Sequence, residues 1–256
     1  MHLTFSPTLC PDLRLKETLD LASQAGFDRI ELFRTWSESS PVHNDISPRM
    51  ARDQFDQAGI VLTSLNIRNL TGRKRDSDER KLDYNIRQLE WDIRLARTLR
   101  LRQVNLKGGE RTDEAAEDLV EGLKNLLETF PDMTFNLGNH LGNRVQGLDD
   151  YRAVLPNVGD RVRVLLDTGH LLTAGEDVMK VADAFAGRIG VVHLRDQKGE
   201  TPVPFGEGDL PFKDLFDLLK ESGFDGSLVV ELEQVTWAEP LEAAKAARGF
   251  VEGLLA

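Results

Sequence analysis

Short apolar runs alternate with longer amphipathic segments along most of this chain. Runs rich in Val, Ile, Leu and Phe are typical of buried strands, and apolar residues at helical spacing predict helices between them. Strands are expected at His2–Ser6, Phe27–Phe33, Ile60–Asn66, Arg102–Lys107, Met133–Leu137, Val162–Asp167, Arg188–Leu194 and Leu228–Leu232. Helices are expected at Leu13–Ala25, Pro48–Ala58, Glu79–Leu99, Asp113–Phe130, Leu148–Leu155, Gly175–Phe185, Pro211–Ser222 and Ala238–Leu255.

Strict alternation of strand and helix predicts a parallel sheet covered by helices. Eight such units in 256 residues match the number and size of an α/β fold of the (β/α)8 type, the TIM barrel. A doubly wound open sheet is the alternative, but no predicted strand is followed by the Gly-x-Gly-x-x-Gly turn of dinucleotide-binding sheets. We therefore predict a single barrel domain over residues 1–256.

Three of the predicted strands end in side chains that can bind a metal. Asp167 ends the sixth strand, His193 lies near the end of the seventh, and Glu231 lies near the end of the eighth. His170 follows Asp167 after one short turn. The carboxyl ends of all barrel strands open on one face, so we expect these residues to share one site. Glu233 has the same strand parity as Glu231, so one of the two could be only a rim carboxylate.

Composition narrows the choice of partners and compartment. A net charge of -11 disfavours a nucleic acid, which needs a basic face. No apolar run is long enough to cross a membrane, and the N-terminus lacks the features of a signal peptide. The single cysteine, Cys10, is expected to be a small buried apolar residue. We expect a cytoplasmic protein that acts on a small molecule.

An Asp, a His and a Glu form a mixed oxygen and nitrogen ligand set without sulfur. Such a set suits one divalent metal ion, with Mn²⁺ as the first candidate and Mg²⁺, Co²⁺, Fe²⁺ or Zn²⁺ as alternatives. An ion there would polarise a carbonyl, so that a carboxylate could remove the neighbouring proton near neutral pH. Glu231 is the candidate base and His170 the candidate contact to a substrate hydroxyl.

The motifs at these strand ends carry a resemblance to a known family. Ala25-Gly-Phe-Asp-Arg-Ile-Glu-Leu32, Leu165-Leu-Asp-Thr-Gly-His170, Val192-His-Leu-Arg-Asp196 and Gly226-Ser-Leu-Val-Val-Glu231 occur in the order seen in xylose-isomerase-like barrels. That group includes sugar isomerases, sugar epimerases and endonuclease IV. The resemblance implies a TIM barrel whose metal is held by Asp167, His193 and Glu231.

One departure from this family's pattern concerns the fifth strand. The group usually carries Glu-Asn-His at its tip, and that Glu is the fourth protein ligand of the metal. Here Gly138 stands in its place, before Asn139 and His140. In the group's ketose epimerases this Glu works opposite the last-strand Glu, so a mechanism with two carboxylates becomes doubtful. His140, Asn136 or water could fill the gap, or the site could be a degenerate one.

Several other residues are expected around the mouth of the barrel. Arg68, Lys107 and Lys198 follow the third, fourth and seventh strands and could bind an anionic group or a developing alkoxide, or could be ordinary rim charges. Trp36 and Trp237 could stack on a sugar or cover the rim. Glu31 is interpreted as structural or as support for a ligand.

Three functions remain open at this point. The first is a metal-dependent isomerase or epimerase of a monosaccharide-like keto-sugar, with Glu231, His170 and Lys107 as catalytic residues and Trp36, Arg68, His140, Lys198 and Trp237 as substrate contacts. The second is a metal-dependent lyase or hydrolase of a keto-sugar or glycoside, for which one base and a metal suffice. The third is a metal-poor, non-catalytic barrel subunit. A homo-oligomer or a partner subunit is compatible with each.

Overall fold

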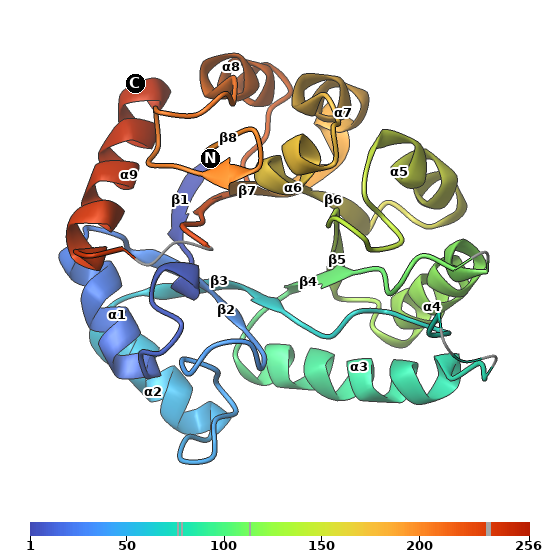
Figure 1. The fold of residues 1–256 in the computed structure, drawn as a ribbon. Coiled ribbons are helices and arrows are strands. Elements are labelled where there is room, and N and C mark those ends of the chain that lie inside the picture. Colours follow the sequence, from blue (N-terminus) through green and yellow to red (C-terminus); the bar gives the residue numbers. More distant parts are fainter. Residues whose placement is uncertain (76, 78, 113, 234–236) are drawn as a thin grey trace.

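The computed structural model describes residues 1–75, 77, 79–112, 114–233 and 237–256. Within them, eight parallel strands close into a barrel in the order β1-β10-β7-β6-β5-β4-β3-β2, and helices surround it (Figure 1). The strands are β1 (His2–Phe5), β2 (Arg29–Phe33), β3 (Val61–Asn66), β4 (Gln103–Lys107), β5 (Thr134–Gly138), β6 (Val162–Asp167), β7 (Ile189–Leu194) and β10 (Ser227–Val230). The predicted TIM barrel is therefore confirmed, with strand ends displaced by one or two residues.

The α-helices cover the outer face of the barrel, except for α6, which lies at its mouth. They are α1 (Leu15–Gln24), α2 (Pro48–Ala58), α3 (Leu82–Thr98), α4 (Ala115–Thr129), α5 (Leu148–Val154), α6 (Thr168–Thr173), α7 (Val178–Phe185), α8 (Phe212–Glu221) and α9 (Pro240–Leu255). Short 3-10 turns lie at Pro7–Leu9, Leu155–Asn157 and Ala186–Arg188. The predicted start of the fourth helix, Asp113, lies outside the described residues. No described helix is both long and apolar enough to cross a membrane.

Helix α2 shows how local sequence sets the boundaries of these elements. The Ser47 side chain accepts a hydrogen bond from the backbone N–H of Met50, and Pro48 occupies the first turn. Gly59 ends the helix with a positive φ of 66°, a conformation that costs glycine little. Both ends of this helix therefore lie where the sequence places them.

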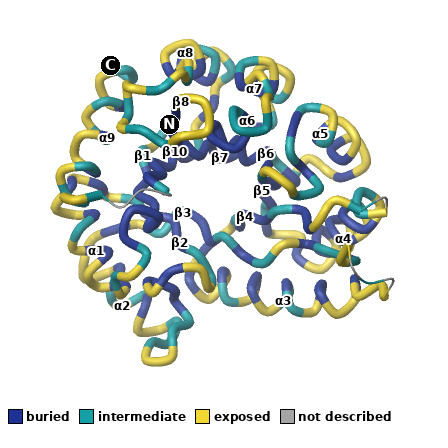
Figure 2. The backbone as a smooth tube through the Cα atoms, in the orientation of Figure 1, coloured by how far each residue is buried: buried dark blue, intermediate teal, exposed yellow. Residues whose placement is uncertain are grey.

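Packing separates the molecule into two apolar regions. The larger core lies between the strands and the helices, so the strands are buried while the outer faces of the helices are exposed (Figure 2). A second, small cluster consists of Leu165, Val191 and Val229. Each precedes one of Asp167, His193 and Glu231 by two positions and shares its strand parity, so this cluster lies inside the barrel.

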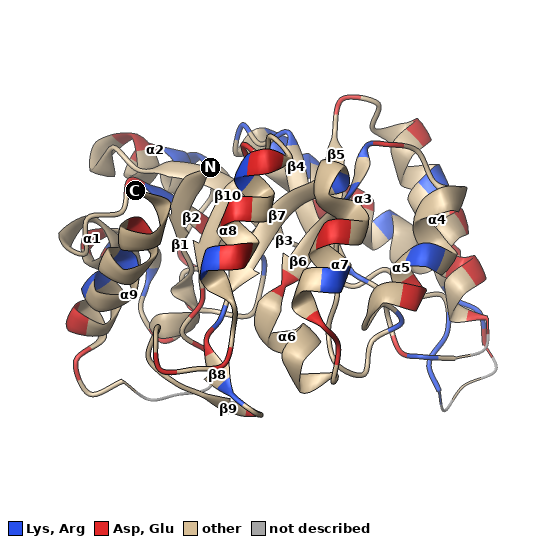
Figure 3. Cartoon of the chain, turned by 90° about the horizontal axis from the view of Figure 1, so that it is seen from above, with Lys and Arg blue, Asp and Glu red and all other residues tan. Residues whose placement is uncertain are grey.

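Two elements differ from the sequence-based prediction. The segment between the predicted strand at Arg188–Leu194 and the predicted helix at Pro211–Ser222 contains a small antiparallel hairpin of β8 (Gln197–Lys198) and β9 (Thr201–Pro202). The single helix expected at 175–185 is preceded by α6, which begins directly after Asp167. The hairpin and α6 lie at the same end of the barrel (Figure 3). Because α6 follows a strand without a loop, it places His170 at the mouth.

Candidate metal centre and substrate pocket

His193 is the centre of a buried cluster at the carboxyl ends of the strands. Its Nδ1 atom lies 3.3 Å from Glu231 Oε1 and 3.8 Å from Asp167 Oδ2. The three side chains come from the ends of β7, β10 and β6, and each is at most 3% exposed. The structure therefore brings together the three residues expected to share one site, although they are far apart in sequence.

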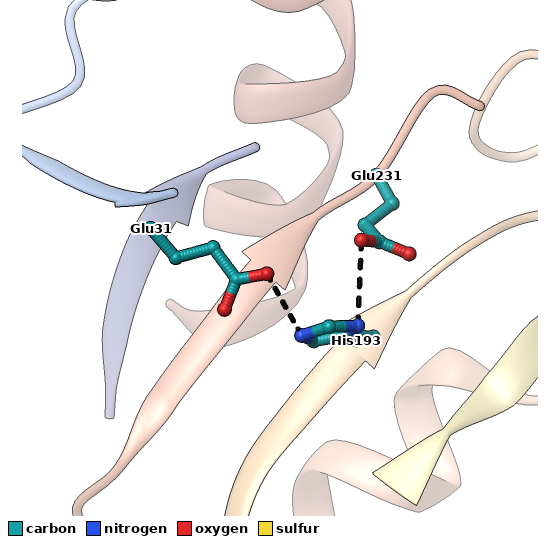
Figure 4. A group of neighbouring side chains, drawn as sticks. All are labelled: Glu31, His193 and Glu231. Carbon is teal, nitrogen blue, oxygen red and sulfur yellow. Dashed lines mark ion pairs between the residues drawn. The ribbon is translucent and has the colours of Figure 1, made fainter. Parts of the chain in front are cut away.

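Glu31 on β2 approaches the other side of the same imidazole ring (Figure 4). Its Oε1 atom lies 3.0 Å from His193 Nε2. Three side chains hold this carboxylate: Ser64 and Asn105 donate to Oε2 at 2.9 Å each, and Asn66 donates to Oε1 at 2.7 Å. A histidine ligand commonly gives its second ring N–H to a carboxylate, which fixes the tautomer. Glu31 is in the position to do this for His193.

One group of donor atoms near His193 lies close enough together to hold a divalent metal. Ligand atoms of Glu31, His193 and Glu231 all lie within 4.8 Å of one another. Asp167 is not in this group, but its Oδ2 atom lies on the Nδ1 side of the ring, as Glu231 Oε1 does. We favour Asp167 over Glu31 as a ligand beside His193 and Glu231, because both oxygens of Glu31 already accept hydrogen bonds. Among the described residues, His193 Nε2 has no well-directed hydrogen bond, although Glu31 Oε1 lies 3.0 Å from it.

Arg195 is a site residue that the sequence analysis missed. Its Nη2 atom lies 3.3 Å from Asp167 Oδ2, 3.0 Å from Glu231 Oε2 and 2.9 Å from Glu233 Oε2. The side chain is only 4% exposed, so the guanidinium is almost wholly desolvated. It binds Oε2 of Glu231 and leaves Oε1 facing His193. One buried cation therefore joins three carboxylates, including Glu233.

These charges change the protonation of the site. Burial opposes the charged forms, but His193, Arg195 and Lys107 lower the pKa of Glu231 well below its usual range. Burial lowers the pKa of the His193 imidazole, but the carboxylates of Glu231 and Glu31 outweigh this effect and raise it well above its usual range. Burial raises the pKa of Glu233. The negative charges of Glu231 and Asp167 raise it further, and the positive charge of Arg195 lowers it by less than this total. A proton on His193 would have to leave before the imidazole could bind a metal.

His170 and His140 lie against each other beside this cluster, with their rings tilted by 47°. Their ring centroids lie 3.8 Å apart, and His140 Nδ1 lies 2.8 Å from the carbonyl oxygen of Leu141. Burial, with the positive charge of Arg195, lowers the pKa of His170 to about 4. Burial and the charge of Lys107 lower the pKa of His140 as well. Both rings are neutral near neutral pH, and so each can accept as well as donate a hydrogen bond.

Gly138 faces the interior of the barrel between its neighbours on β4 and β6. A Cβ atom built there would lie 3.4 Å from Leu165 Cδ2 and 3.5 Å from Lys107 Cγ, so a side chain could begin there with small adjustments. Asn136 lies deeper, where its amide donates 2.9 Å to Asn105 Oδ1. Asn139 instead anchors the backbone of Asp167 through two hydrogen bonds of 2.9 and 3.0 Å. No described side chain on β5 replaces the absent carboxylate.

Two cavities open at the mouth. A polar cavity of about 220 Å³ is lined by Arg68, Lys107, His140 and Trp36, among the residues expected to contact substrate. A less polar cavity of about 450 Å³ lies next to it and contains both Trp36 and Trp237. Trp237 donates from Nε1 to the Leu232 carbonyl at 3.0 Å, while Trp36 is half exposed.

Lys198 and Cys10 are placed differently from these residues. Lys198 is exposed on the β8–β9 hairpin and is not among the residues lining either cavity. Cys10 is buried beside the larger cavity, as expected. The association of Lys198 with substrate therefore stays a prediction without support from its position.

The fold and the cluster together define a class: a (β/α)8 barrel with a metal-capable carboxylate and histidine site at the carboxyl ends of its strands. Sequence comparison gives the family directly. The profile of the xylose isomerase-like TIM barrel family matches residues 19–253, and the chain belongs to this family. The family predicted from the strand-end motifs is thus confirmed.

The curated relatives that the chain matches include inosose dehydratases. Inosose dehydratase of Clostridium tetani is 34% identical over 165 residues, which is 55% of each chain. Inosose dehydratase of Lacticaseibacillus casei is 29% identical over 168 residues, or 56% of each. The chain thus spans about half the length of the curated relatives it matches.

Solved structures resemble the whole chain. An L-ribulose 3-epimerase has a TM-score of 0.81 at 22% identity, covering 99% of this chain and 94% of its own. The IolI protein, solved with a bound zinc atom, has a TM-score of 0.83 at 21% identity, covering 100% and 98%. At these identities the likeness establishes the fold alone.

Strand parity and burial could have identified Arg195, which the sequence analysis missed, and the role of Glu31. Arg195 follows His193 by two positions, one residue past the end of β7, so an extended chain there points both side chains to the same side. Glu31 is flanked by Ile30 and Leu32, so a strand buried on both faces had to bury this carboxylate as well. A buried charge needs a partner, and that requirement could have indicated both residues.

Proposed function

We propose that this protein is a metal-dependent lyase that acts on a keto-sugar-like substrate by eliminating a group β to a carbonyl. The observation that carries this proposal is the asymmetry of the site: Glu231 stands at one side, and Gly138 offers no second carboxylate across from it. Elimination needs one base next to the carbonyl, whereas epimerisation through two carboxylates needs a pair. The named dehydratase relatives support the same reaction class.

Asp167, His193 and Glu231 would hold the metal. A divalent ion bound there would polarise the substrate carbonyl and stabilise the enediolate that forms beside it. Mn²⁺ remains the first candidate; zinc in the IolI protein supports a divalent ion without selecting one for this chain. Glu31 would keep the His193 ring oriented through Nε2.

Glu231 would accept the proton from the carbon next to the carbonyl. Its pairing with Arg195 keeps the carboxylate ionised and fixes its orientation. Leu165, Val191 and Val229 form an apolar floor beneath it, which excludes water and strengthens the electrostatic contacts above. His170 would bind a substrate hydroxyl, and the ammonium group of Lys107 would give a proton to the leaving oxygen, which departs as water or an alcohol.

An isomerase or epimerase is the second candidate, and the position of Lys107 favours it. Lys107 is the register partner of Gly138, so its side chain lies on the strand next to the absent carboxylate. Its charge reaches Glu231, because it contributes to the lowered pKa of that residue. A cationic acid across from a carboxylate base could return a proton to the opposite face of the substrate carbon.

Product analysis in D₂O with a panel of ketoses and keto-glycosides separates these reactions. A lyase gives an unsaturated or rearranged product and releases water or an alcohol, whereas an epimerase gives deuterium at one carbon of an intact sugar. We expect the first pattern. An intact, deuterated epimer as the only product would contradict the lyase.

The metal requirement is tested on purified protein. Asp167→Ala and His193→Ala should each lower bound metal and turnover while the far-ultraviolet circular dichroism stays that of the parent. Full activity of either variant without metal would refute the metal role. A parent chain that binds no divalent ion and turns over no substrate would instead support the non-catalytic subunit. Unfolding on chelation would mean that the metal is structural.

A further inference from the structure

The polar cavity is cationic, although the protein as a whole is acidic. Arg34, Arg68 and Lys107 line it, and Glu233 is the single acidic residue among its described lining residues. Glu233 is already bound to Arg195 at 2.9 Å, so its charge is largely used within the site. In a chain with net charge -11, positive charges gathered in one cavity need a specific explanation.

A buried carboxylate holds the two arginines in place. Asp92 on α3 is 1% exposed, and its Oδ1 atom accepts a hydrogen bond from Arg34 Nε. Oδ1 also lies 3.4 Å from Arg68 Nη1, and Oδ2 accepts from the Arg68 backbone N–H at 3.4 Å. Arg68 Nη1 donates in addition to the Gln88 carbonyl at 3.1 Å. One helix therefore fixes two arginines that follow different strands, β2 and β3.

The arginines keep donors free after these contacts. Arg34 uses only Nε, and its two terminal nitrogens donate to no described residue. Nε and Nη2 of Arg68 likewise donate to none of the residues in the described ranges. The side chains are 21% and 32% exposed, so they are partly desolvated yet reachable from the cavity. Free guanidinium donors suit the oxygens of a carboxylate or phosphate.

We propose that Arg34 and Arg68, positioned by Asp92, form an anion-binding subsite that selects substrates carrying a carboxylate or a phosphate. The subsite deepens the proposed function, because it names the substrate class: an acidic or phosphorylated sugar rather than a neutral one. Asp92 is a positioning residue, since it is buried behind the arginines. The alternative is that the arginines only tie α3 to the barrel rim.

Equilibrium binding by calorimetry tests the subsite without turnover. D-glucuronate and D-glucose 6-phosphate are each compared with D-glucose, so the two arms distinguish a carboxylate from a phosphate. We expect at least one anion to bind about tenfold or more tighter than glucose. Arg34→Gln and Arg68→Gln should each remove that preference. Arg87 is an exposed arginine on α3, the helix that carries Asp92, and Arg87→Gln should keep the preference.

Two outcomes would overturn the subsite. One is equal affinity of the parent for glucose and both anions, or no binding of either anion up to about 10 mM. The other is an unchanged preference in both arginine variants. The assay measures binding alone, so the two proposals can fail separately. A protein that prefers anions but gives no elimination product refutes the lyase and supports the subsite. A protein that gives the elimination product but shows no preference for anions supports the lyase and refutes the subsite.

Asp92→Asn separates positioning from net charge. The substitution removes a negative charge next to the cavity, so a purely electrostatic effect would tighten anion binding. If Asp92 positions the arginines, binding should weaken about tenfold despite the added positive charge. Tighter binding would refute the positioning role. Should this buried substitution lower folding yield, Arg34→Lys gives the same test: the charge stays, the forked geometry is lost, and anion preference should fall.

Discussion

On the side of β6, β7 and β10, the mouth of the barrel presents Asp167, His193 and Glu231 above an apolar floor. On the side of β3, β4 and β5, it presents Arg68 and Lys107 above a floor of amides and hydroxyls. We call the first side the acidic half and the second the basic half. The floor of amides and hydroxyls consists of the side chains of Ser64, Asn66, Asn105 and Asn136.

The two floors serve different tasks. Leu165, Val191 and Val229 exclude water beneath the acidic half, where a proton would be removed. The amides on the other side hold Glu31, which in turn faces His193 across the barrel. In the proposed function the acidic half carries out the chemistry, while the basic half orients His193 and binds the remainder of the substrate.

The largest expected effect comes from breaking the acidic half at its base. Glu231→Gln should lower kcat by about 10²–10⁴, because general base catalysis contributes about that factor. Glu233→Gln is the matched control: it also contacts Arg195 but lies farther out, and it should lose less activity. Steady-state turnover on the substrate found in the D₂O panel measures both. Equal losses would mean that the base has been assigned to the wrong glutamate.

Arg195 tests the charge balance of the same half. Arg195→Met removes the guanidinium from the buried Asp167 and Glu231 and from the partly exposed Glu233, which should cost about 3–5 kcal/mol in the free energy of unfolding. A divalent ion can replace part of the lost charge, so added Mn²⁺ or Zn²⁺ should raise the Tm of the variant more than that of the parent. Thermal unfolding with and without metal provides the measurement. An unchanged Tm without metal would show that the three carboxylates do not depend on Arg195.

Much of the acidic half could be predicted from sequence, because its signals are local. Asp167, His193 and Glu231 each end an apolar run, and barrel topology then brings them together. The basic half depends on tertiary contacts. Nothing near Asp92 in sequence indicates that α3 turns this carboxylate toward Arg34 and Arg68, which follow two other elements.

The fold shows the same limit. Apolar runs give the barrel strands, but the β8–β9 hairpin lies in a segment dominated by loop residues. Helix α6 is too short for a clear apolar period, and it forms because Asp167 caps it by accepting from the His170 N–H at 2.9 Å. The residue expected to bind metal therefore also begins a helix, and a sequence pattern does not reveal that second role.

Gly138→Glu brings a carboxylate into the basic half and makes the two halves more alike. The space next to Gly138 admits a Cβ, and Lys107 is the nearest charged neighbour. We expect the new carboxylate to pair with Lys107 and to occupy room that the native substrate uses, so native turnover should fall by about tenfold. Gly138→Gln adds a side chain of the same size without the charge, so it separates the loss of room for the substrate from the pairing with Lys107.

A different result from Gly138→Glu would be equally informative. Tighter metal binding together with new ketose-epimerase activity would mean that the site has simply lost its fourth ligand. Metal affinity is measured by titration, and turnover on the same panel of ketoses and keto-glycosides. A variant that matches the parent in both would mean that position 138 does not face the substrate.

The smallest effect on turnover is expected at Cys10, which lies outside both halves and serves as a reference. Burial raises the pKa of its thiol from the ordinary 9.0 to about 11. At pH 8 the folded chain should therefore hold about 100-fold less thiolate than the unfolded chain, and a thiol reagent should react correspondingly slowly before urea is added. Above pH 9 the unfolded state releases this proton first, so stability falls as the pH rises from about 9 to about 11. Cys10→Ala should remove that part of the decline in Tm and leave turnover at pH 8 unchanged, whereas a loss of turnover would place the larger cavity within the working site.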